Sequence, residues 1–155
     1  MGGVTPVAIA LGSNLGDRRA HLDWAVDRLR SHVAHLRVST RIETEPVEVD
    51  GPQPRYVNAA AVGETSLGPD ELLQALLAIE RERGRERPSR RAPRTLDLDL
   101  ILFGDLVSHA PHLTLPHPRF RVRRFVLEPL AELVPDWTDP VTGRTVADLL
   151  GDLGR

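Results

Sequence analysis

The order of strand-like and helix-like segments constrains the fold of this chain more than any other feature of its sequence. Four segments have the apolar runs or the alternation of strands, namely residues 7–11, 36–44, 56–67 and 95–103. Between them, apolar side chains recur at helical spacing from residue 22 to 33 and from residue 72 to 80. The expected order is therefore strand, helix, strand, strand, helix, strand.

This order matches the ferredoxin-like arrangement, in which an antiparallel sheet carries helices on one face. The residues from Gly104 onward add a short strand, a proline-rich stretch and helices near residues 125–133 and 145–153. We expect an α+β fold with a ferredoxin-like βαββαβ core and additional C-terminal strands and helices, as one domain over residues 1–155. The proline-containing residues 45–54 and the arginine-rich residues 84–93 are expected to be loops.

Composition excludes several classes of function. The 155 residues include no cysteine, which excludes disulfides and thiol catalysis. All 20 basic residues are arginine, so the chain has no lysine for a Walker-type phosphate loop or a Schiff base. The formal net charge of −2 argues against general binding to nucleic acid, and no apolar run reaches the length of a membrane span. With no signal-peptide pattern at Met1, we expect a cytoplasmic protein without nucleic-acid or membrane partners.

Asp97 and Asp99 are the strongest candidates for chemistry. In a strand, residues i and i+2 point to the same face, so these two carboxylates are expected side by side. A divalent cation relieves their repulsion, and Mg²⁺ prefers such oxygen ligands. Alternating aspartates would also be tolerated on the exposed face of an edge strand. Aspartate is a poor strand former, however, which favours a metal site over that alternative.

Arginine side chains gather in two short segments of the chain. Of the 20 arginines, 11 lie within residues 81–94 and 119–124. The planar guanidinium matches phosphate geometry, and the first of these segments leads directly into the strand that carries Asp97. A metal-bound phosphate ligand is therefore indicated. The glutamates interleaved in the first segment leave a solvated charged loop as the alternative.

Several other side chains permit two interpretations. Tyr56 and Phe125, two of only six aromatic residues, either fill the core or form a slot that stacks a flat heterocycle. Asn58 shares a strand face with Tyr56 and offers both a donor and an acceptor to a ring edge. His117 lies between two prolines and either binds phosphate or lies at the surface. Residues 12–17 resemble a glycine loop before a helix, but a tight turn with a helix cap is favoured.

Five motifs along the chain together resemble one enzyme family. They are Leu11-Gly12-Ser13-Asn14-Leu15-Gly16-Asp17, Thr44-Glu45-Pro46-Val47, Tyr56-Val57-Asn58-Ala59-Ala60, Pro93-Arg94-Thr95-Leu96-Asp97-Leu98-Asp99-Leu100-Ile101-Leu102, and Leu115-Pro116-His117-Pro118 followed by Arg123-Arg124-Phe125-Val126-Leu127. In this order they are similar to the 6-hydroxymethyl-7,8-dihydropterin pyrophosphokinases of folate biosynthesis, over about residues 7–137. The resemblance implies transfer of pyrophosphate from MgATP to the hydroxymethyl group of 6-hydroxymethyl-7,8-dihydropterin, with release of AMP.

The resemblance also implies roles for individual residues. Asp97 and Asp99 would bind two Mg²⁺ ions, and Arg85 and Arg94 would assist the transfer step. The residues expected to bind the pterin are Thr44, Glu45, Val47, Tyr56, Asn58 and Phe125. The residues expected to bind ATP are Glu80, Arg87, Arg90, Arg94, Leu100, His117 and Arg123. ATP would be the co-substrate. We expect the enzyme to be a monomer.

Two other functions share this order of elements. A two-metal nucleotidyl transferase of the polymerase-palm type also places paired aspartates on a ferredoxin-like sheet. The arginine-rich segment before the aspartate strand, together with Tyr56 and Asn58, favours the pterin enzyme. An RNA-recognition module needs aromatic side chains on its inner strands, whereas Asp97 and Asp99 would repel RNA phosphates.

Overall fold

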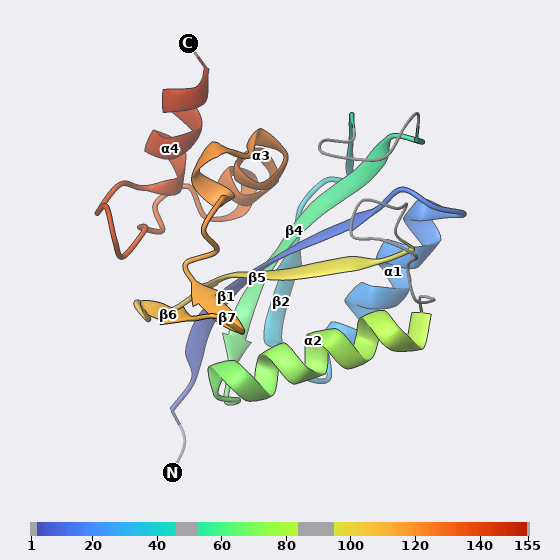
Figure 1. Cartoon of the computed structure of the whole chain (residues 1–155), viewed down its shortest axis with the longest axis horizontal. Coiled ribbons are helices and arrows are strands. Elements are labelled where there is room, and N and C mark those ends of the chain that lie inside the picture. Colours follow the sequence, from blue (N-terminus) through green and yellow to red (C-terminus); the bar gives the residue numbers. More distant parts are fainter. Residues whose placement is uncertain (1–2, 46–52, 84–94, 155) are drawn as a thin grey trace.

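The computed structural model describes residues 3–45, 53–83 and 95–154, and this part of the chain forms an antiparallel sheet with helices on both faces (Figure 1). The strands of the main sheet are β1 (Thr5–Ser13), β2 (Ala34–Val38), β3 (Ile42–Thr44), β4 (Tyr56–Thr65) and β5 (Asp97–Phe103). A separate hairpin consists of β6 (Ser108–Ala110) and β7 (Leu113–Leu115). The helices are α1 (Arg18–Leu29), α2 (Pro69–Arg83), α3 (Arg124–Leu133) and α4 (Val146–Leu153), and η1 (Phe120–Val122) is a 3-10 turn.

The strand order of the sheet is β2-β4-β1-β5, and β3 pairs with the beginning of β4. Neighbouring strands are antiparallel throughout. This is the order of a ferredoxin-like sheet, and it confirms the fold class expected from the sequence. It makes β1 and β4 the central strands and β5 an edge strand.

The first core lies between the sheet and the helices α1 and α2. It includes Leu11 of β1, Leu98 of β5, Leu22 of α1 and Leu76 of α2, all buried. The helix α1 begins after Asp17, whose carboxylate accepts a hydrogen bond from the Ala20 N–H at 3.2 Å. The predicted helix cap is therefore present.

The second core lies on the opposite face of the sheet, where the C-terminal helices pack (Figure 1). Buried residues of β4 and β5 meet Phe120, Leu127 of α3 and Leu149 of α4 there. The ferredoxin-like core alone carries helices on one face, so the C-terminal additions make this a three-layer structure. In the described part of the chain, no helix combines the length and the apolar character needed to cross a membrane.

The prediction of one continuous strand over residues 36–44 was wrong, because this segment is divided between β2 and β3. Ser39 is buried between them, and its N–H donates to the Ala60 carbonyl at 2.9 Å. Its hydroxyl then accepts the Ala60 N–H at 2.9 Å, so a side chain takes the place of a backbone acceptor. Thr40 turns outward, and its N–H and hydroxyl donate to Glu132 of α3 at 3.0 and 3.2 Å. The strand therefore breaks and resumes beside the start of β4.

The first strand was predicted to end before Gly12, but β1 continues through Ser13. Gly12 is paired on both sides, with Asn58 of β4 and Asp97 of β5. The predicted turn is therefore shorter than residues 12–17. Its glycine at Gly16 has a positive φ of 71°, a conformation that glycine adopts without strain.

A candidate site at one end of the sheet

Asp97 and Asp99 lie on the face of the sheet that the C-terminal helices cover. Asp97 is paired with Gly12 and Asp99 with Ala10, and directly paired residues share a face of the sheet. Leu98, between them, points into the first core with α1 and α2. Both aspartates are half-buried although β5 is an edge strand. The structure therefore places both carboxylates on one face, as the alternation predicted.

A row of paired residues connects Asp97 with the candidate pterin residues. Gly12 lies between Asp97 of β5 and Asn58 of β4, so Asp97 and Asn58 are two strands apart. Neighbouring strands are about 4.8 Å apart, which separates the two backbones by roughly 10 Å. The next row contains Asp99, Ala10 and Ala60. Glycine and alanine thus form a floor without large side chains between the aspartates and β4.

Gly12 leaves room for two larger side chains from β4. A Cβ atom at Gly12 would lie 2.9 Å from Asn58 Oδ1 and 3.4 Å from Tyr56 Cδ1. The Tyr56 ring and the Asn58 amide therefore lean over the backbone of β1 toward the aspartate side. Residues i and i+2 of a strand were expected to share a face, and the structure confirms this for Tyr56 and Asn58.

Strand β3 orients the Asn58 amide. Thr44 pairs with Tyr56, and its hydroxyl accepts a hydrogen bond from Asn58 Nδ2. This contact directs Asn58 Oδ1 toward Gly12, and the Asn58 side chain is nearly buried. Glu45 is exposed and forms an ion pair with Arg55 at 3.1 Å.

Phe125 and Arg123 come from the beginning of α3, on the same face of the sheet. Arg123 is the residue that precedes the helix, and Phe125 lies in its first turn. The Arg123 guanidinium carbon is 5.5 Å from the centroid of the Phe125 ring, a cation–π contact. The helix α3 packs on β4 and β3, which brings its first turn to the face that carries Tyr56. Phe125 is half-buried and packs partly against the second core.

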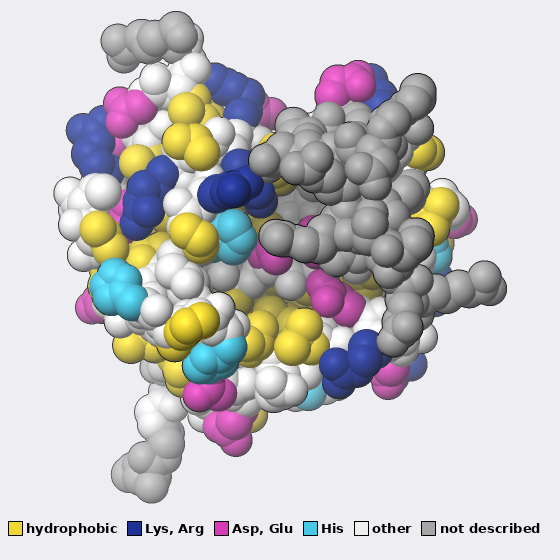
Figure 2. All heavy atoms as spheres, viewed as in Figure 1, with side chains coloured by type: hydrophobic (Ala, Val, Ile, Leu, Met, Phe, Trp, Pro, Cys, Tyr) yellow, Lys and Arg dark blue, Asp and Glu magenta, His cyan; other side chains and the backbone are white. Residues whose placement is uncertain are grey.

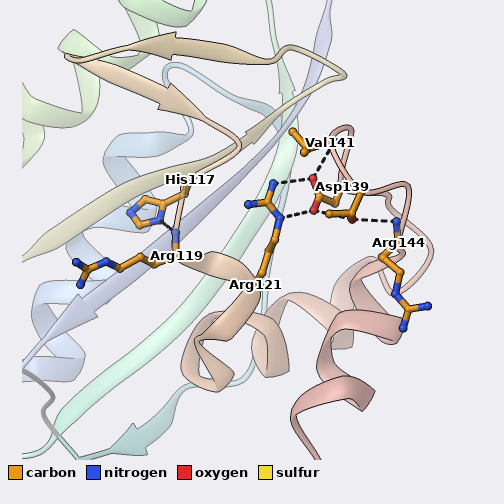
Figure 3. A network of polar contacts seen from close by, with 7 residues as sticks. His117, Arg119, Arg121, Asp139, Val141 and Arg144 are labelled. Atoms are coloured by element: carbon orange, nitrogen blue, oxygen red, sulfur yellow. Dashed lines mark hydrogen bonds and ion pairs between the residues drawn. The ribbon is translucent and has the colours of Figure 1, made fainter.

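His117 is fixed beside the edge strand that carries the aspartates. Its N–H donates to the Ile101 carbonyl of β5 at 2.9 Å, and its Nδ1 accepts from the Arg119 N–H at 3.3 Å (Figure 3). Burial, followed by the positive charge of Arg123, lowers the pKa of His117 to about 4, while the charge of Asp97 acts in the opposite direction. The ring is therefore neutral at pH 7, and its Nε2–H remains as a donor.

The low pKa of His117 gives the protein a testable pH dependence. A histidine with a lower pKa in the folded than in the unfolded protein, about 4 against 6.5, binds fewer protons when folded. Its contribution to stability is complete above about pH 6.5 and is lost as the pH falls through about 4. In His117→Gln, we expect a smaller fall in the unfolding free energy between these pH values, measured by urea denaturation in EDTA. The control is His109→Gln, at an exposed histidine; equal flattening there would contradict the assignment.

Glu80 and Leu100 lie beside the site but do not point onto its floor. Glu80, near the end of α2, accepts the Leu98 N–H of β5 at 2.6 Å, so its carboxylate meets the backbone of the edge strand. The Leu100 side chain is buried in the first core. A contact from Leu100 to a ligand on the aspartate face would therefore have to come from its main chain.

Five of the expected site residues lie outside the described residues, namely Val47, Arg85, Arg87, Arg90 and Arg94. Among the described residues, no group of three or more His, Asp and Glu side chains could hold a metal ion. Asp97 and Asp99 are still suited to Mg²⁺, because their oxygens are hard ligands and Mg²⁺ usually takes its other ligands from water and phosphate. Figure 2 shows acidic side chains within a recess near the centre of the face, with arginine and histidine side chains close to it.

Two residues of this site were not identified from the sequence. Gly12 was interpreted as part of a turn, whereas it forms the floor between Asp97 and Asn58. Arg119 was counted in an arginine-rich segment without a role, yet its charge acts on His117. Arginine next to the Leu-Pro-His-Pro motif was the available signal for Arg119. For Gly12 the signal is a contact across strands, which no local pattern contains.

Comparison with known proteins gives one consistent family. Residues 8–135 match the family model of 7,8-dihydro-6-hydroxymethylpterin-pyrophosphokinase (HPPK). A Pseudomonas aeruginosa 2-amino-4-hydroxy-6-hydroxymethyldihydropteridine pyrophosphokinase is 42% identical over 149 residues, which is 93% of this chain and 89% of that protein. A Bacillus subtilis protein of the same name is 46% identical over 127 residues, covering 81% and 75%.

Two further matches are to longer proteins, of which this chain covers less than half. An Arabidopsis thaliana mitochondrial folate synthesis bifunctional protein is 43% identical over 134 residues, which is 86% of this chain and 24% of that protein. Among solved structures, the wild-type Plasmodium falciparum HPPK-DHPS has a TM-score of 0.76 at 14% identity. The match covers 98% of this chain and 45% of that one, so this chain spans less than half of its length. At that identity the likeness concerns the fold alone.

Proposed function

The chain belongs to the 7,8-dihydro-6-hydroxymethylpterin-pyrophosphokinase family, and on this basis we propose that it transfers the pyrophosphoryl group of ATP to the hydroxymethyl group of 6-hydroxymethyl-7,8-dihydropterin. The products are AMP and the pterin pyrophosphate, an intermediate of folate biosynthesis. The observation that carries the proposal is that Gly12 of β1 pairs with Asp97 on one side and with Asn58 on the other. This register brings a carboxylate suited to Mg²⁺ and an amide suited to the polar edge of a pterin onto the same face of the sheet.

The metal site of the proposed enzyme consists of Asp97 and Asp99. Two Mg²⁺ ions held there would neutralise the charge of the triphosphate and of the two carboxylates. The half-buried position of both aspartates, on the same face as His117 and Arg123, supports this assignment. The two carboxylates would hold these ions on one face of the sheet.

The pterin lies in the proposed complex over the small residues of β1, between the rings of Tyr56 and Phe125. Asn58 reads its edge through Oδ1, while Thr44 holds the amide in that orientation. The backbones of Glu45 and Val47 complete the edge contacts. A flat ring gains from two aromatic faces and from a buried amide with both donor and acceptor.

ATP lies in the proposed complex along the edge strand β5. His117 donates from Nε2 to a phosphate oxygen, and Arg123 adds a bidentate contact at the start of α3. Further contacts come from Glu80, the main chain of Leu100, and the arginines Arg87, Arg90 and Arg94. An anionic ligand favours protonation of a nearby histidine, so the pKa of His117 should rise when ATP binds.

The proposed chemistry is an in-line displacement at the β-phosphorus of ATP. The hydroxymethyl oxygen forms a bond to that phosphorus, the bond to the oxygen bridging the α-phosphorus breaks, and AMP leaves with that oxygen. The hydroxyl proton passes to water. Such a transfer depends mainly on positioning and charge neutralisation, and Arg85 and Arg94 contribute to both.

The experiment that tests this function separates AMP from ADP after incubation with MgATP and the pterin. Pterin-dependent AMP together with the pterin pyrophosphate supports pyrophosphoryl transfer. ADP in place of AMP would contradict it and would indicate transfer of a single phosphoryl group. AMP attached to an acceptor, with release of inorganic pyrophosphate, would favour a nucleotidyl transferase.

We further propose that residues 1–155 act as one domain, as a monomer in the cytoplasm. Both cores share the same sheet, so neither layer can be separated from the other without exposing apolar residues. Size-exclusion chromatography with light scattering tests the monomer; a dimer that persists on dilution would contradict it.

A further inference from the structure

A short segment, residues 117–123, carries three residues that can present positive charge or a donor near the candidate site. His117 and Arg123 stand at its ends, and Arg119 lies next to His117. At the first end, His117 is bonded to β5 through the Ile101 carbonyl. Between the ends lies η1, whose Phe120 is fully buried in the second core. The directions of these three side chains therefore depend on the contacts that fix the position of η1.

The Arg121 side chain connects η1 with Asp139 in the loop between α3 and α4 (Figure 3). Its Nε and Nη2 donate to the two carboxylate oxygens of Asp139, the second at 3.0 Å. Figure 3 shows His117 and Arg119 on one side of this segment and Arg121 with Asp139 on the other. The contact is bidentate, which fixes direction as well as distance.

Asp139 is a fully buried carboxylate, whereas the Arg121 side chain is 26% exposed. Asp139 also accepts the Val141 N–H at 3.0 Å and the Thr142 hydroxyl at 2.8 Å. These hydrogen bonds, with Arg121 as the strongest, outweigh burial and lower the pKa of Asp139 to about 2. The pair is therefore charged throughout the neutral range, and without Arg121 the carboxylate would keep, among the described residues, only the Val141 N–H and the Thr142 hydroxyl.

The loop between α3 and α4 gives Asp139 a fixed position. The Asp139 N–H donates to the Arg144 carbonyl and the Gly143 N–H donates to the Asp139 carbonyl, both at 2.8 Å. Thr138 and Thr145 pair as an isolated bridge that closes the loop. The carboxylate is thus attached to a closed turn that starts from α3 and ends at α4.

We propose that Asp139 is a positioning residue, which acts through Arg121 to set the direction of His117, Arg119 and Arg123 toward the phosphates of ATP. This inference rests on the proposed function, because it requires a nucleotide at these three side chains. A purely structural ion pair would stabilise the C-terminal layer without favouring one ligand over the other. Most of the described pterin residues lie on β3 and β4, and Phe125 alone shares the start of α3 with Arg123, so nucleotide affinity should respond more than pterin affinity.

The test uses Arg121→Gln, because Arg121 is partly exposed and its replacement leaves the other hydrogen bonds of Asp139 in place. We expect its affinity for the Mg²⁺ complex of α,β-methylene ATP to fall about tenfold or more, since small displacements of positioned groups have large effects. Pterin affinity, measured at saturating nucleotide, should fall much less, because Phe125 is the one described pterin residue next to this segment. Arg121→Lys should recover part of the nucleotide affinity, because it restores the charge and one hydrogen bond.

Arg144→Gln is the matched control, because Arg144 is in the same loop but pairs with Asp152 of α4 at 2.7 Å. It should leave both affinities unchanged. Wild-type nucleotide affinity in Arg121→Gln would overturn the proposal, and so would equal losses for both ligands. A wild-type protein that does not bind the nucleotide analogue would contradict the proposed function itself, and with it this inference.

Discussion

Replacing Asp97 with asparagine should abolish pyrophosphoryl transfer and leave the fold intact. Asp97 is half-buried at the first position of β5 and paired with Gly12, so the same-sized asparagine fits the strand. Metal-assisted charge neutralisation supplies several kcal/mol, so we expect a loss of about a thousandfold or more in the rate of AMP formation. Asparagine keeps the shape of the side chain, which separates loss of charge from loss of packing.

The rate is measured as pterin-dependent AMP formation, and the fold by circular dichroism and thermal unfolding. Asp105→Asn is the control, because Asp105 follows β5 and is exposed at the other end of the same strand. It should behave as wild type. An active Asp97→Asn protein would remove Asp97 from the proposed metal site, and an unfolded one would make Asp97 a structural residue.

The fold was largely predictable because apolar side chains recur with a period of two residues in its strands and 3.6 residues in its helices. The alternation over residues 95–103 predicts both β5 and the common face of Asp97 and Asp99, and both are present. The division of residues 36–44 was not predictable, because it depends on a hydrogen bond between the Ser39 hydroxyl and Ala60 of another strand. Local alternation favours Thr40 as the inward residue, and the cross-strand contact buries Ser39 instead.

The candidate site was predictable one strand at a time. The i, i+2 rule places Tyr56 with Asn58, and Asp97 with Asp99, but it contains no register between the two strands. That register passes through Gly12 of β1, which the sequence pattern assigned to a turn. Likewise, Arg121 and Asp139 meet across the space between η1 and the loop before α4, and neither belongs to a periodic pattern.

Adding a methyl group at Gly12 should selectively weaken pterin binding. In Gly12→Ala, the new Cβ lies 2.9 Å from Asn58 Oδ1 and 3.4 Å from the Tyr56 ring. The first distance is too short, so Asn58 must move. It is 6% exposed and bonded to Thr44, so it cannot move without leaving the orientation that reads the pterin. Overpacking of this kind costs about 1–3 kcal/mol when the displaced side chain is forced back, and if pterin binding requires that return, affinity should fall roughly 5- to 150-fold.

The measurement is pterin affinity at saturating nucleotide analogue, followed by nucleotide affinity alone. Nucleotide affinity should stay at the wild-type value, because Gly12 faces Asn58 and Tyr56 rather than His117. Gly151→Ala is the matched control, since no atom lies within 4 Å of the methyl group it would add on α4. Tyr56→Ala, which removes the stacking ring, should also weaken the pterin selectively. Equal losses of both ligands in Gly12→Ala would mean that the substitution disturbs the whole sheet.

The displacement of Asn58 can be separated from direct contact with the ligand by a double-mutant cycle. If the methyl group acts by moving Asn58, Gly12→Ala should cost little further pterin affinity once Asn58 is already alanine. Residues in direct contact show such coupling, whereas independent sites add. If the two losses are additive instead, the methyl group acts independently of Asn58, through the Tyr56 ring or the pterin itself.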